Sequence, residues 1–377
     1  EWNHNFGKYD YSTNKKRINE YWQSRITEIK EKNVNTIMTL GMRGIHDSGM
    51  EGVSSLAEGM AFVDTIMTTQ RTMLSTTLEK PITQIPQVFI PYKEVLYIYD
   101  EGLKVPEDVT LMWTDDNYGY IRRLSNEEEQ KRIGGSGVYY HLSYWGRPHD
   151  YLWLSTTQPG LIWHEMSRAY ANGARKIWIA NVGDIKPGEY GMEFFLDLAW
   201  DINSIEESTI HEHLRQWSAR EFGAEIADEI AMVMNEYYRL AFLRKPEYMG
   251  WSQTEPTTPT RITDFSNQHA KDRIAAYDML YKKTDSLQSL LPQEKLAAWF
   301  QLVAYPVKGA ALMNRKFLYQ QLALTEKDEA DKASYIKKSE EAFNTIKELT
   351  AYYNKELKGG KWNHMMSMTP RNLPVFD

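Results

Sequence analysis

The sequence predicts an α/β protein in which a parallel sheet is followed by an all-helical domain. Before residue 202, amphipathic helical segments alternate with short and continuously apolar strands. This alternation is typical of a parallel sheet that is covered by helices on both faces. From about residue 206 to 356, only long amphipathic helical patterns occur. We therefore expect the sheet to end, and the helical domain to begin, near residue 203.

The expected elements of the first part follow one another in a regular order. Apolar residues at helical spacing predict a helix over residues 13–32. Five strands are expected at 36–40, 86–90, 109–114, 138–144 and 176–181. Between them, helices are expected at 54–79 and 159–173, and a helical turn at 125–132. Parallel strands require crossover connections, and the gaps between these strands are long enough to hold them.

The second part is expected to consist of helices alone. Pro306 lies inside the apolar run LAAWFQLVAYPVKGAALM and should kink or divide that helix. The last stretch is rich in Gly, Pro and Met, which predicts an irregular segment. The predicted domains are therefore residues 1–203, 204–360 and 361–377.

Composition excludes several classes of function. The 377 residues carry a net charge of −7, which leaves no field to attract phosphate backbones, so nucleic acid is not expected as a partner. The absence of cysteine excludes disulfides, thiolate metal sites and a cysteine nucleophile, but does not fix the compartment. No apolar run approaches the roughly 20 residues of a membrane span. The 24 Tyr and 12 Trp suit sugar stacking or, equally, a large core.

Polar side chains follow each of the five expected strands. Chemistry in parallel α/β folds sits beyond the carboxyl ends of the strands, where loops converge. A single polar strand end could be a helix cap, but five in a row indicate a shared cleft. The residues concerned are Met42–Asp47, Pro91–Glu94, Thr114–Tyr118, His141 with Ser143–Arg147, and Asn181–Asp184.

Two of these residues suit acid and base chemistry. Asp47 and Glu94 come from different strands, and such a pair can protonate a leaving oxygen and activate a water at an acetal. Arg43 lies close to Asp47 in sequence, and its planar fork would match the carboxylate of an anionic substrate.

Each candidate also has a structural interpretation that the sequence leaves open. Asp47 could cap the helix after Gly52, and Glu94 could be an acid in a first helical turn, where the helix dipole favours it. Asn117 lies in an Asp-Asp-Asn run that could form a turn. His141 stands within an aromatic strand and could be a core histidine.

Known cofactor motifs are absent from the sequence. It contains no dinucleotide fingerprint, phosphate-binding loop, HExxH or nucleophile elbow. His211 and His213 are two positions apart on an expected helix, so their imidazoles should point apart, and a metal site there is not expected.

Seven stretches of the chain resemble glycoside hydrolase family 115. They are TLGMRG (39–44), VFIPYKEV (88–95), VTLMWTDDNYGYIRRL (109–124), GGSGVYYHLSYWGRP (134–148), RKIWIANVGDIKP (175–187), FFLDLAWD (194–201) and MMSMTPRNLPVF (365–376). Members of this family are xylan α-1,2-glucuronidases, which remove glucuronic acid or its 4-O-methyl ether from glucuronoxylan.

The resemblance implies a particular place in a larger fold. The family has an N-terminal α/β domain, a (β/α)8 barrel, a helical domain and a C-terminal β-sandwich. This chain would supply the last five strands of the (β/α)8 TIM barrel and the helical domain. The resemblance also implies a secreted or periplasmic protein that needs no metal or organic cofactor, and a homodimer through the helical domain is a further expectation.

The resemblance also implies roles for individual residues. Asp47 and Glu94 match the carboxylates of an inverting acid and base pair, without showing which is which. The positions that match substrate-holding groups are Arg43, Asn117, His141, Tyr144 and Asn181. The family usually reads MRGDGDE, and this chain departs from it at Ile45, His46 and Ser48, which puts the aim of Asp47 in question.

The expected function is that of an inverting α-1,2-glucuronidase acting on glucuronoxylan or xylo-oligosaccharides. Inversion requires the two carboxyl groups to lie roughly 6.5–9.5 Å apart, with a water between them. The alternatives are a glycan-binding member of the family without catalysis, and an inactive fragment of such an enzyme.

Overall fold

A computed structural model describes residues 2–45, 48–116, 118–144, 152, 154–183, 185–252 and 258–369. The chain forms two compact units. The sheet unit comprises Glu1–Asp116, Ile121–Tyr140 and Ser167–Ile179, and the helical unit comprises Asn117–Tyr120, His141–Met166 and Ala180–Asp377. The predicted domain limits at residues 203 and 360 stay predictions.

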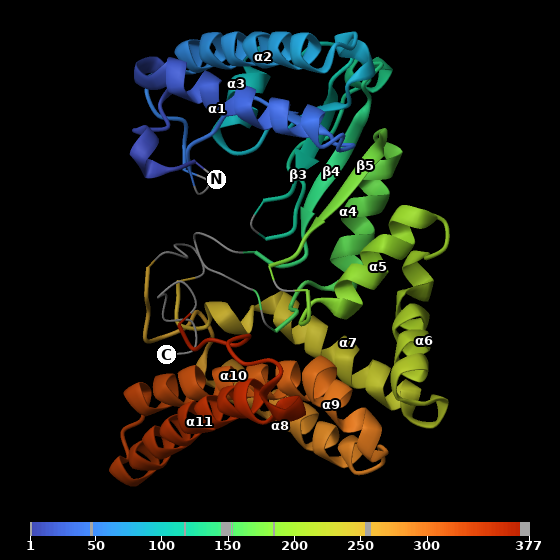
Figure 1. Cartoon of the computed structure of the whole chain (residues 1–377). Coiled ribbons are helices and arrows are strands. Elements are labelled where there is room, and N and C mark those ends of the chain that lie inside the picture. Colours follow the sequence, from blue (N-terminus) through green and yellow to red (C-terminus); the bar gives the residue numbers. More distant parts are fainter. Residues whose placement is uncertain are drawn as a thin grey trace. The chain divides into compact units, whose positions relative to one another are not determined.

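Strands and helices alternate through the first 200 residues (Figure 1). The elements in order are α1 (Tyr11–Glu31), β1 (Met38–Leu40), α2 (Leu56–Leu78), β2 (Gln87–Phe89), α3 (Glu94–Asp100), β3 (Thr110–Thr114), a 3₁₀ turn at Glu129–Lys131, β4 (Ser136–His141), α4 (Pro159–Ala171), β5 (Ala174–Asn181) and α5 (Glu189–Trp200). The predicted alternation is therefore present. The expected turn at 125–132 is limited to three residues of 3₁₀ helix.

The five strands form one sheet in the order in which they occur along the chain, β1-β2-β3-β4-β5. The first four are parallel, with Leu40 opposite Phe89, Phe89 opposite Leu111, and Met112 opposite Gly137. A parallel sheet whose neighbours are consecutive strands, joined by helical crossovers, is the arrangement of a (β/α)8 barrel. The architecture is a partial TIM barrel with a helical domain, as predicted.

Burial separates the inner strands from the outer ones. β2 is buried throughout, and so are β3 up to its last residue and all of β4 except Tyr139. β1 and β5, the outermost strands, carry partly exposed residues. Strands that are covered on both faces must be apolar on both faces, which explains the continuous apolar runs in β2 and β3.

The helical unit contains the long helices predicted after residue 206 (Figure 1). They are α6 (Ile210–Phe222), α7 (Ala227–Leu243), α8 (Asn267–Gln288), α9 (Leu296–Trp299), α10 (Tyr305–Thr325) and α11 (Glu329–Lys355). Within this unit, Tyr305 and Met313 of α10 share an apolar core with Ile346 and Tyr353 of α11. The described residues after Asn181 form no strand, and their one isolated bridge pairs Trp251 with Pro259.

Pro306 interrupts a helix in the predicted place but does not end it. It is the second residue of α10, and the five residues before α10, Phe300–Ala304, form a π-helical turn. Proline has no N–H to bond one turn back and its ring crowds the preceding turn, and a wider π turn is one way for a helix to continue past such a residue.

One helical stretch, Gln293–Thr325, is long and apolar enough to cross a membrane. However, 67% of its most apolar window is buried inside the protein, as expected for the core helix of a helical domain. Among the described residues no other helix meets this criterion.

Candidate active site

Arg43 and Glu94 form a two-pronged ion pair at neighbouring strand ends of the sheet unit. Nε of Arg43 donates to Oε1 of Glu94 at 3.0 Å, and Nη2 donates to Oε2 at 2.9 Å. The two side chains are 17% and 30% exposed, so the pair is shielded but can be reached from solvent. A bidentate pair fixes the orientation of both planes, which a single contact does not.

The end of β1 is held by a side chain that acts like a neighbouring strand. Gln70 of α2 accepts a hydrogen bond from the N–H of Gly41 at 2.9 Å and donates one to the carbonyl of Gly41 at 3.1 Å. Gly41 has φ +93, and a Cβ there would lie 3.3 Å from the ring of Phe89. Only glycine meets both demands without strain, and this clamp sets where the chain leaves the strand toward Arg43.

The loop after Arg43 is closed by its own backbone. The N–H of Gly44 donates to the carbonyl of Ser48 at 3.0 Å, and the N–H of Ser48 donates to the carbonyl of Ile45 at 3.2 Å. A Cβ on Gly44 would lie 2.1 Å from Oγ of Ser48 and 2.4 Å from the carbonyl of Gly49, so this position requires glycine. Asp47, the other predicted carboxylate, lies outside the described residues.

Glu94 is delivered by an unusual backbone. It is the first residue of α3, so it is also the first-turn acid that the alternative interpretation proposed. The preceding residue, Lys93, has φ +51 and ψ −122, a conformation that costs free energy for any side chain with a Cβ. Such strain gathers at functional sites, because the surrounding structure must impose it.

Tyr92 forms an aromatic floor beside the pair. Its ring centroid lies 5.1 Å from the guanidinium carbon of Arg43 and 5.0 Å from Nζ of Lys93. Two cations near one ring stabilise the strained turn before Glu94, since each is attracted by the quadrupole of the ring. The Pro91–Glu94 segment therefore places aromatic, cationic and acidic groups together.

The end of β3 forms a tight loop. Asp115, which is buried, makes an isolated antiparallel bridge with Ile121, and Asp116 pairs with Arg122 at 3.6 Å. All four residues belong to the sheet unit, and these two contacts bring the segment after β3 back toward the end of the strand. Asn117, the predicted substrate residue of this run, lies outside the described residues.

Three further predicted residues lie together in the helical unit. His141 ends β4 and Asn181 ends β5, and the N–H of Leu142 donates to the carbonyl of Asn181 at 3.0 Å. The rings of His141 and Tyr144 meet edge to face with centroids 5.2 Å apart. Next to them, the N–H of Gly183 donates to Oγ of Ser143 at 2.6 Å. The ends of β4 and β5 thus bring a histidine, a tyrosine and an amide to one place.

The predicted site residues are therefore found in two groups. Arg43 and Glu94 meet in the sheet unit, and His141, Tyr144 and Asn181 gather in the helical unit. The prediction that they line a single hollow, and that Asp47 joins them, stays a prediction.

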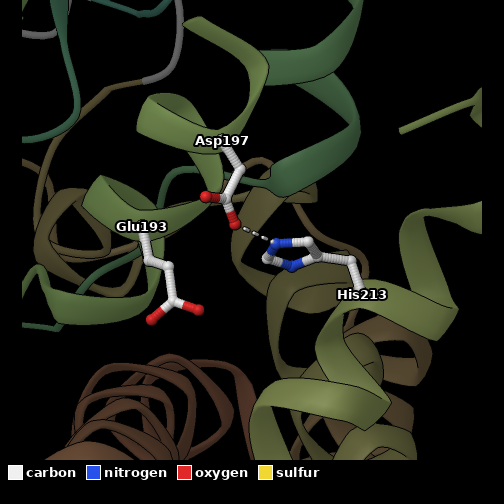
Figure 2. Close-up of side chains that lie close together, drawn as sticks. All are labelled: Glu193, Asp197 and His213. Atoms are coloured by element: carbon white, nitrogen blue, oxygen red, sulfur yellow. Dashed lines mark hydrogen bonds and ion pairs between the residues drawn. The ribbon is translucent and has the colours of Figure 1, made fainter. Parts of the chain in front are cut away.

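A histidine of α6 lies in a small cluster of possible metal ligands (Figure 2). Ligand atoms of Glu193, Asp197 and His213 lie within 4.8 Å of one another, and Nε2 of His213 is 2.9 Å from Oδ2 of Asp197. However, Arg220 binds both oxygens of Glu193, at 2.8 and 2.7 Å. The guanidinium already supplies the positive charge that a cation would bring.

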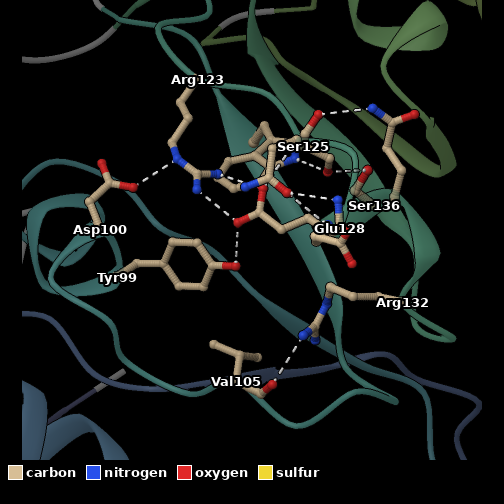
Figure 3. A network of polar contacts seen from close by, with 12 residues as sticks. Tyr99, Asp100, Val105, Arg123, Ser125, Glu128, Arg132 and Ser136 are labelled. Atoms are coloured by element: carbon tan, nitrogen blue, oxygen red, sulfur yellow. Dashed lines mark hydrogen bonds and ion pairs between the residues drawn. The ribbon is translucent and has the colours of Figure 1, made fainter.

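Arg123, which the sequence analysis did not select as a functional residue, is the centre of a polar network in the sheet unit (Figure 3). Arg123 binds both oxygens of Glu129 at 3.0 and 2.7 Å, and it also pairs with Asp100 at 2.7 Å. Its guanidinium carbon lies 5.1 Å from the ring of Tyr99 and 4.6 Å from the ring of Trp113. The adjacent Arg122-Arg123 pair gave no signal that distinguished the exposed arginine from the enclosed one.

The chain was compared with known proteins. A family model described as glycosyl hydrolase family 115 matches residues 1–248. The chain belongs to this family. A solved structure titled as a family GH115 4-O-methyl-α-glucuronidase, BtGH115A, with specificity for decorated arabinogalactans, is 46% identical, with a TM-score of 0.90 over 98% of this chain.

A second similar structure is titled as a GH138 enzyme targeting pectin rhamnogalacturonan II. It is 11% identical with a TM-score of 0.56, over 95% of this chain and 49% of that one, so the likeness shows the fold alone. Comparison with curated proteins gave no match. The chain spans 48% of the length of BtGH115A, about half of that protein.

Proposed function

We propose that the protein containing this chain is an inverting α-glucuronidase, which releases glucuronic acid or its 4-O-methyl ether from a polysaccharide. The observation that carries the proposal is the Arg43–Glu94 pair, held at neighbouring strand ends behind a strained Lys93. Membership of a glycoside hydrolase family supports the same reaction class. Two carboxylates at strand ends suit hydrolysis of an acetal.

Inversion needs two different carboxyl groups. One donates a proton to the glycosidic oxygen as its bond to the anomeric carbon breaks, and the other takes a proton from the water that attacks the opposite face. We assign Glu94 and Asp47 to these roles. The products are the free uronic acid, with inverted configuration, and the polysaccharide with a restored hydroxyl group.

Arg43 has a positioning role in this proposal. Its fork is engaged by Glu94, so it fixes the plane of the carboxylate before substrate arrives. Orientation of this kind contributes to catalysis because a misplaced group loses much of its effect. The same guanidinium would attract the uronate of the substrate by its charge.

We propose glucuronoxylan or its oligosaccharides as the substrate. An arabinogalactan decorated with uronic acid is a second candidate, because BtGH115A, 46% identical to this chain, is described as specific for decorated arabinogalactans. Both polymers are too large to enter a cell intact, so we also propose a secreted or periplasmic location.

The test is to incubate the complete protein with glucuronoxylan and, separately, with decorated arabinogalactan, and to follow the anomeric proton of the released acid by NMR. Release with the β configuration as the first product supports an inverting α-glucuronidase, and the better polysaccharide identifies the substrate. An α product first would contradict inversion. Uronic acid binding by calorimetry without release from either polymer would favour a glycan-binding protein instead.

A further inference from the structure

A small cavity lies in the helical unit, apart from the groups assigned above. Its volume is about 160 Å³, and it is formed by three stretches of chain: residues 118–120, residues 156–161 at the start of α4, and residues 241–252 after and including the end of α7. Ligand pockets for drug-sized molecules measure roughly 300–1,000 Å³. This cavity therefore has room for one small ring and not for an oligosaccharide.

The walls of the cavity have the composition of a sugar site. Tyr118 and Tyr120 are 39% and 44% exposed, which is a large exposed fraction for aromatic residues of a folded domain. Amphipathic aromatic rings offer an apolar face together with a polar tip. Thr156, Gln158 and Ser252 add hydroxyl and amide groups to the lining. A sugar ring has an apolar C–H face and a rim of hydroxyls, and this lining matches both.

Two cationic residues of the lining are committed to the fold. Arg244, which is buried, donates to the carbonyls of Tyr248 and Trp251, the first at 2.9 Å. Nζ of Lys245 donates to the carbonyl and to Oγ1 of Thr156, at 3.3 and 3.1 Å. These groups hold the cavity wall together, so they do not form an open fork for a carboxylate.

Burial also shifts the ionisation of Lys245 in the wall and of Glu247 beside it. Burial lowers the pKa of Lys245, and it raises the pKa of the neighbouring Glu247, although the charge of each partly opposes the shift of the other. With a pKa of about 8, Lys245 keeps most of its charge at neutral pH, and its hydrogen bonds go to Thr156. Because neither Lys245 nor Arg244 offers an open fork, the occupant that such a wall favours is a neutral sugar and not a second uronic acid.

The cavity shares its wall with residues at the predicted site in the same unit. Tyr248 packs against Tyr144, and the ring of Tyr118 meets the ring of Tyr248 edge to face at 6.1 Å. In addition, Oγ1 of Thr157 donates to the carbonyl of Leu142 at 2.7 Å, next to His141. A sugar in the cavity would thus be separated from Tyr144 by the ring of Tyr248.

We propose that this cavity is a subsite for one neutral sugar residue of the glycan that carries the uronic acid, with Tyr118 and Tyr120 as stacking surfaces. The inference rests on the proposed function, because it names where the rest of that substrate lies. Tyr118 and Tyr120 then determine the affinity for the glycan and take no part in bond cleavage.

The test separates the binding of the glycan from the binding of the uronic acid. KM and kcat are measured with a uronic-acid-bearing oligosaccharide, together with the inhibition constant of free glucuronic acid, which occupies only the uronic acid pocket. In Tyr118→Ala we expect KM to rise roughly three- to tenfold, the range for loss of one aromatic contact, while kcat and the inhibition constant stay within about twofold. Tyr118→Phe keeps the ring and should stay close to wild type.

Two further variants serve as controls for this test. If Tyr118→Ala fails to fold, Tyr120→Ala should show the same result, a raised KM with an unchanged kcat and an unchanged inhibition constant. Trp200→Ala removes an aromatic side chain of the helical unit that is 93% exposed and should change none of the constants. An unchanged KM in both tyrosine variants, or an equal loss of affinity for the oligosaccharide and for glucuronic acid, would overturn the proposal.

Failure of the proposed function is a separate outcome. If the wild-type protein releases no uronic acid, that function is wrong, and the cavity is then tested by calorimetry with neutral xylotetraose and with a neutral arabinogalactan oligosaccharide. Binding that weakens in Tyr118→Ala, but not in Trp200→Ala, would support the subsite by itself. No binding of either oligosaccharide would reject it.

Discussion

The sheet unit contains two arginine–glutamate pairs that are alike in geometry and differ in surroundings. Arg43–Glu94 and Arg123–Glu129 are both two-pronged, and each arginine lies against an aromatic ring. In the second pair, Glu129 also accepts hydrogen bonds from the N–H of Asn126 and the hydroxyl of Tyr99, at 2.9 and 2.8 Å. Glu94 has only Arg43 among the described residues.

The difference is the one expected between the proposed catalytic carboxylate, Glu94, and a structural one, Glu129. Glu129 is 12% exposed and its oxygens are occupied from several sides, so it can stabilise the fold but cannot meet a substrate. Glu94 is 30% exposed, and within the described ranges of the chain Arg43 is the side chain that orients it. A carboxylate that must accept or donate a proton needs this combination of fixed orientation and an open side.

The largest expected effect separates the two glutamates by activity. Glu94→Gln should lower kcat on the polysaccharide by about 10²–10⁴-fold, because the amide can neither take up nor release the proton in the bond-breaking step. Glu129→Gln is the matched control and should leave kcat within a few-fold. Steady-state kinetics on both purified variants measures this. Near-normal turnover of Glu94→Gln would remove Glu94 from the acid and base pair.

The next effect separates the two arginines by stability. Arg123→Met should lower the free energy of unfolding by about 3 kcal/mol, because it leaves the shielded Glu129 without its partner. Arg43→Met should lower it by about 1 kcal/mol or less, since its glutamate is more exposed. Urea denaturation of both variants gives the two values. Equal losses would mean that the site pair is as structural as the other one.

The smallest expected effect is the pH dependence of the stability that Glu129 contributes. Burial alone would raise the pKa of Glu129, but hydrogen bonds from Arg123, Asn126 and Tyr99 lower it below its ordinary value of 4.5. The stability that this group contributes is therefore fully present above pH 4.5 and is lost as the pH falls through the lowered pKa. Glu129→Gln should be less stable than wild type at neutral pH, with a gap that narrows on acidification. Thermal unfolding from about pH 6 to about pH 3 measures it. A gap that stays constant would contradict this origin.

Periodicity predicted the five strands and most of the long helices, but not α5 (Glu189–Trp200). Continuous apolar runs indicated the strands, because inner parallel strands are buried on both faces. The predicted ends of the strands were less accurate where side-chain hydrogen bonds hold the chain. β4 was expected at 138–144, but it ends at His141. Beyond it, the Leu142 carbonyl accepts from Thr157 and the Ser143 hydroxyl from Gly183, so these residues bond to other segments.

For the candidate site, the sequence predicted only which strand ends lie next to each other. Arg43 and Glu94 could be expected to meet because they follow neighbouring parallel strands. The two hydrogen bonds between Gln70 and the backbone of Gly41 could not be predicted, since nothing in the sequence of a helix shows which residue its glutamine will contact. The backbone of Lys93 could not be predicted either, because lysine is not a residue that marks positive φ.

The backbone closure between Gly44 and Ser48 separates two properties of the loop that carries Asp47, one of the two proposed catalytic carboxylates. Its attachment is encoded at the two anchors, in the main chain of Ser48 and in Gly44, where any side chain would collide with the closed loop. Its chemistry is encoded between them, at the stretch where this chain departs from the usual family sequence. Substitutions inside the loop can thus alter specificity without loosening its base, and exchanging that short stretch between relatives is a practical route to new substrate preferences.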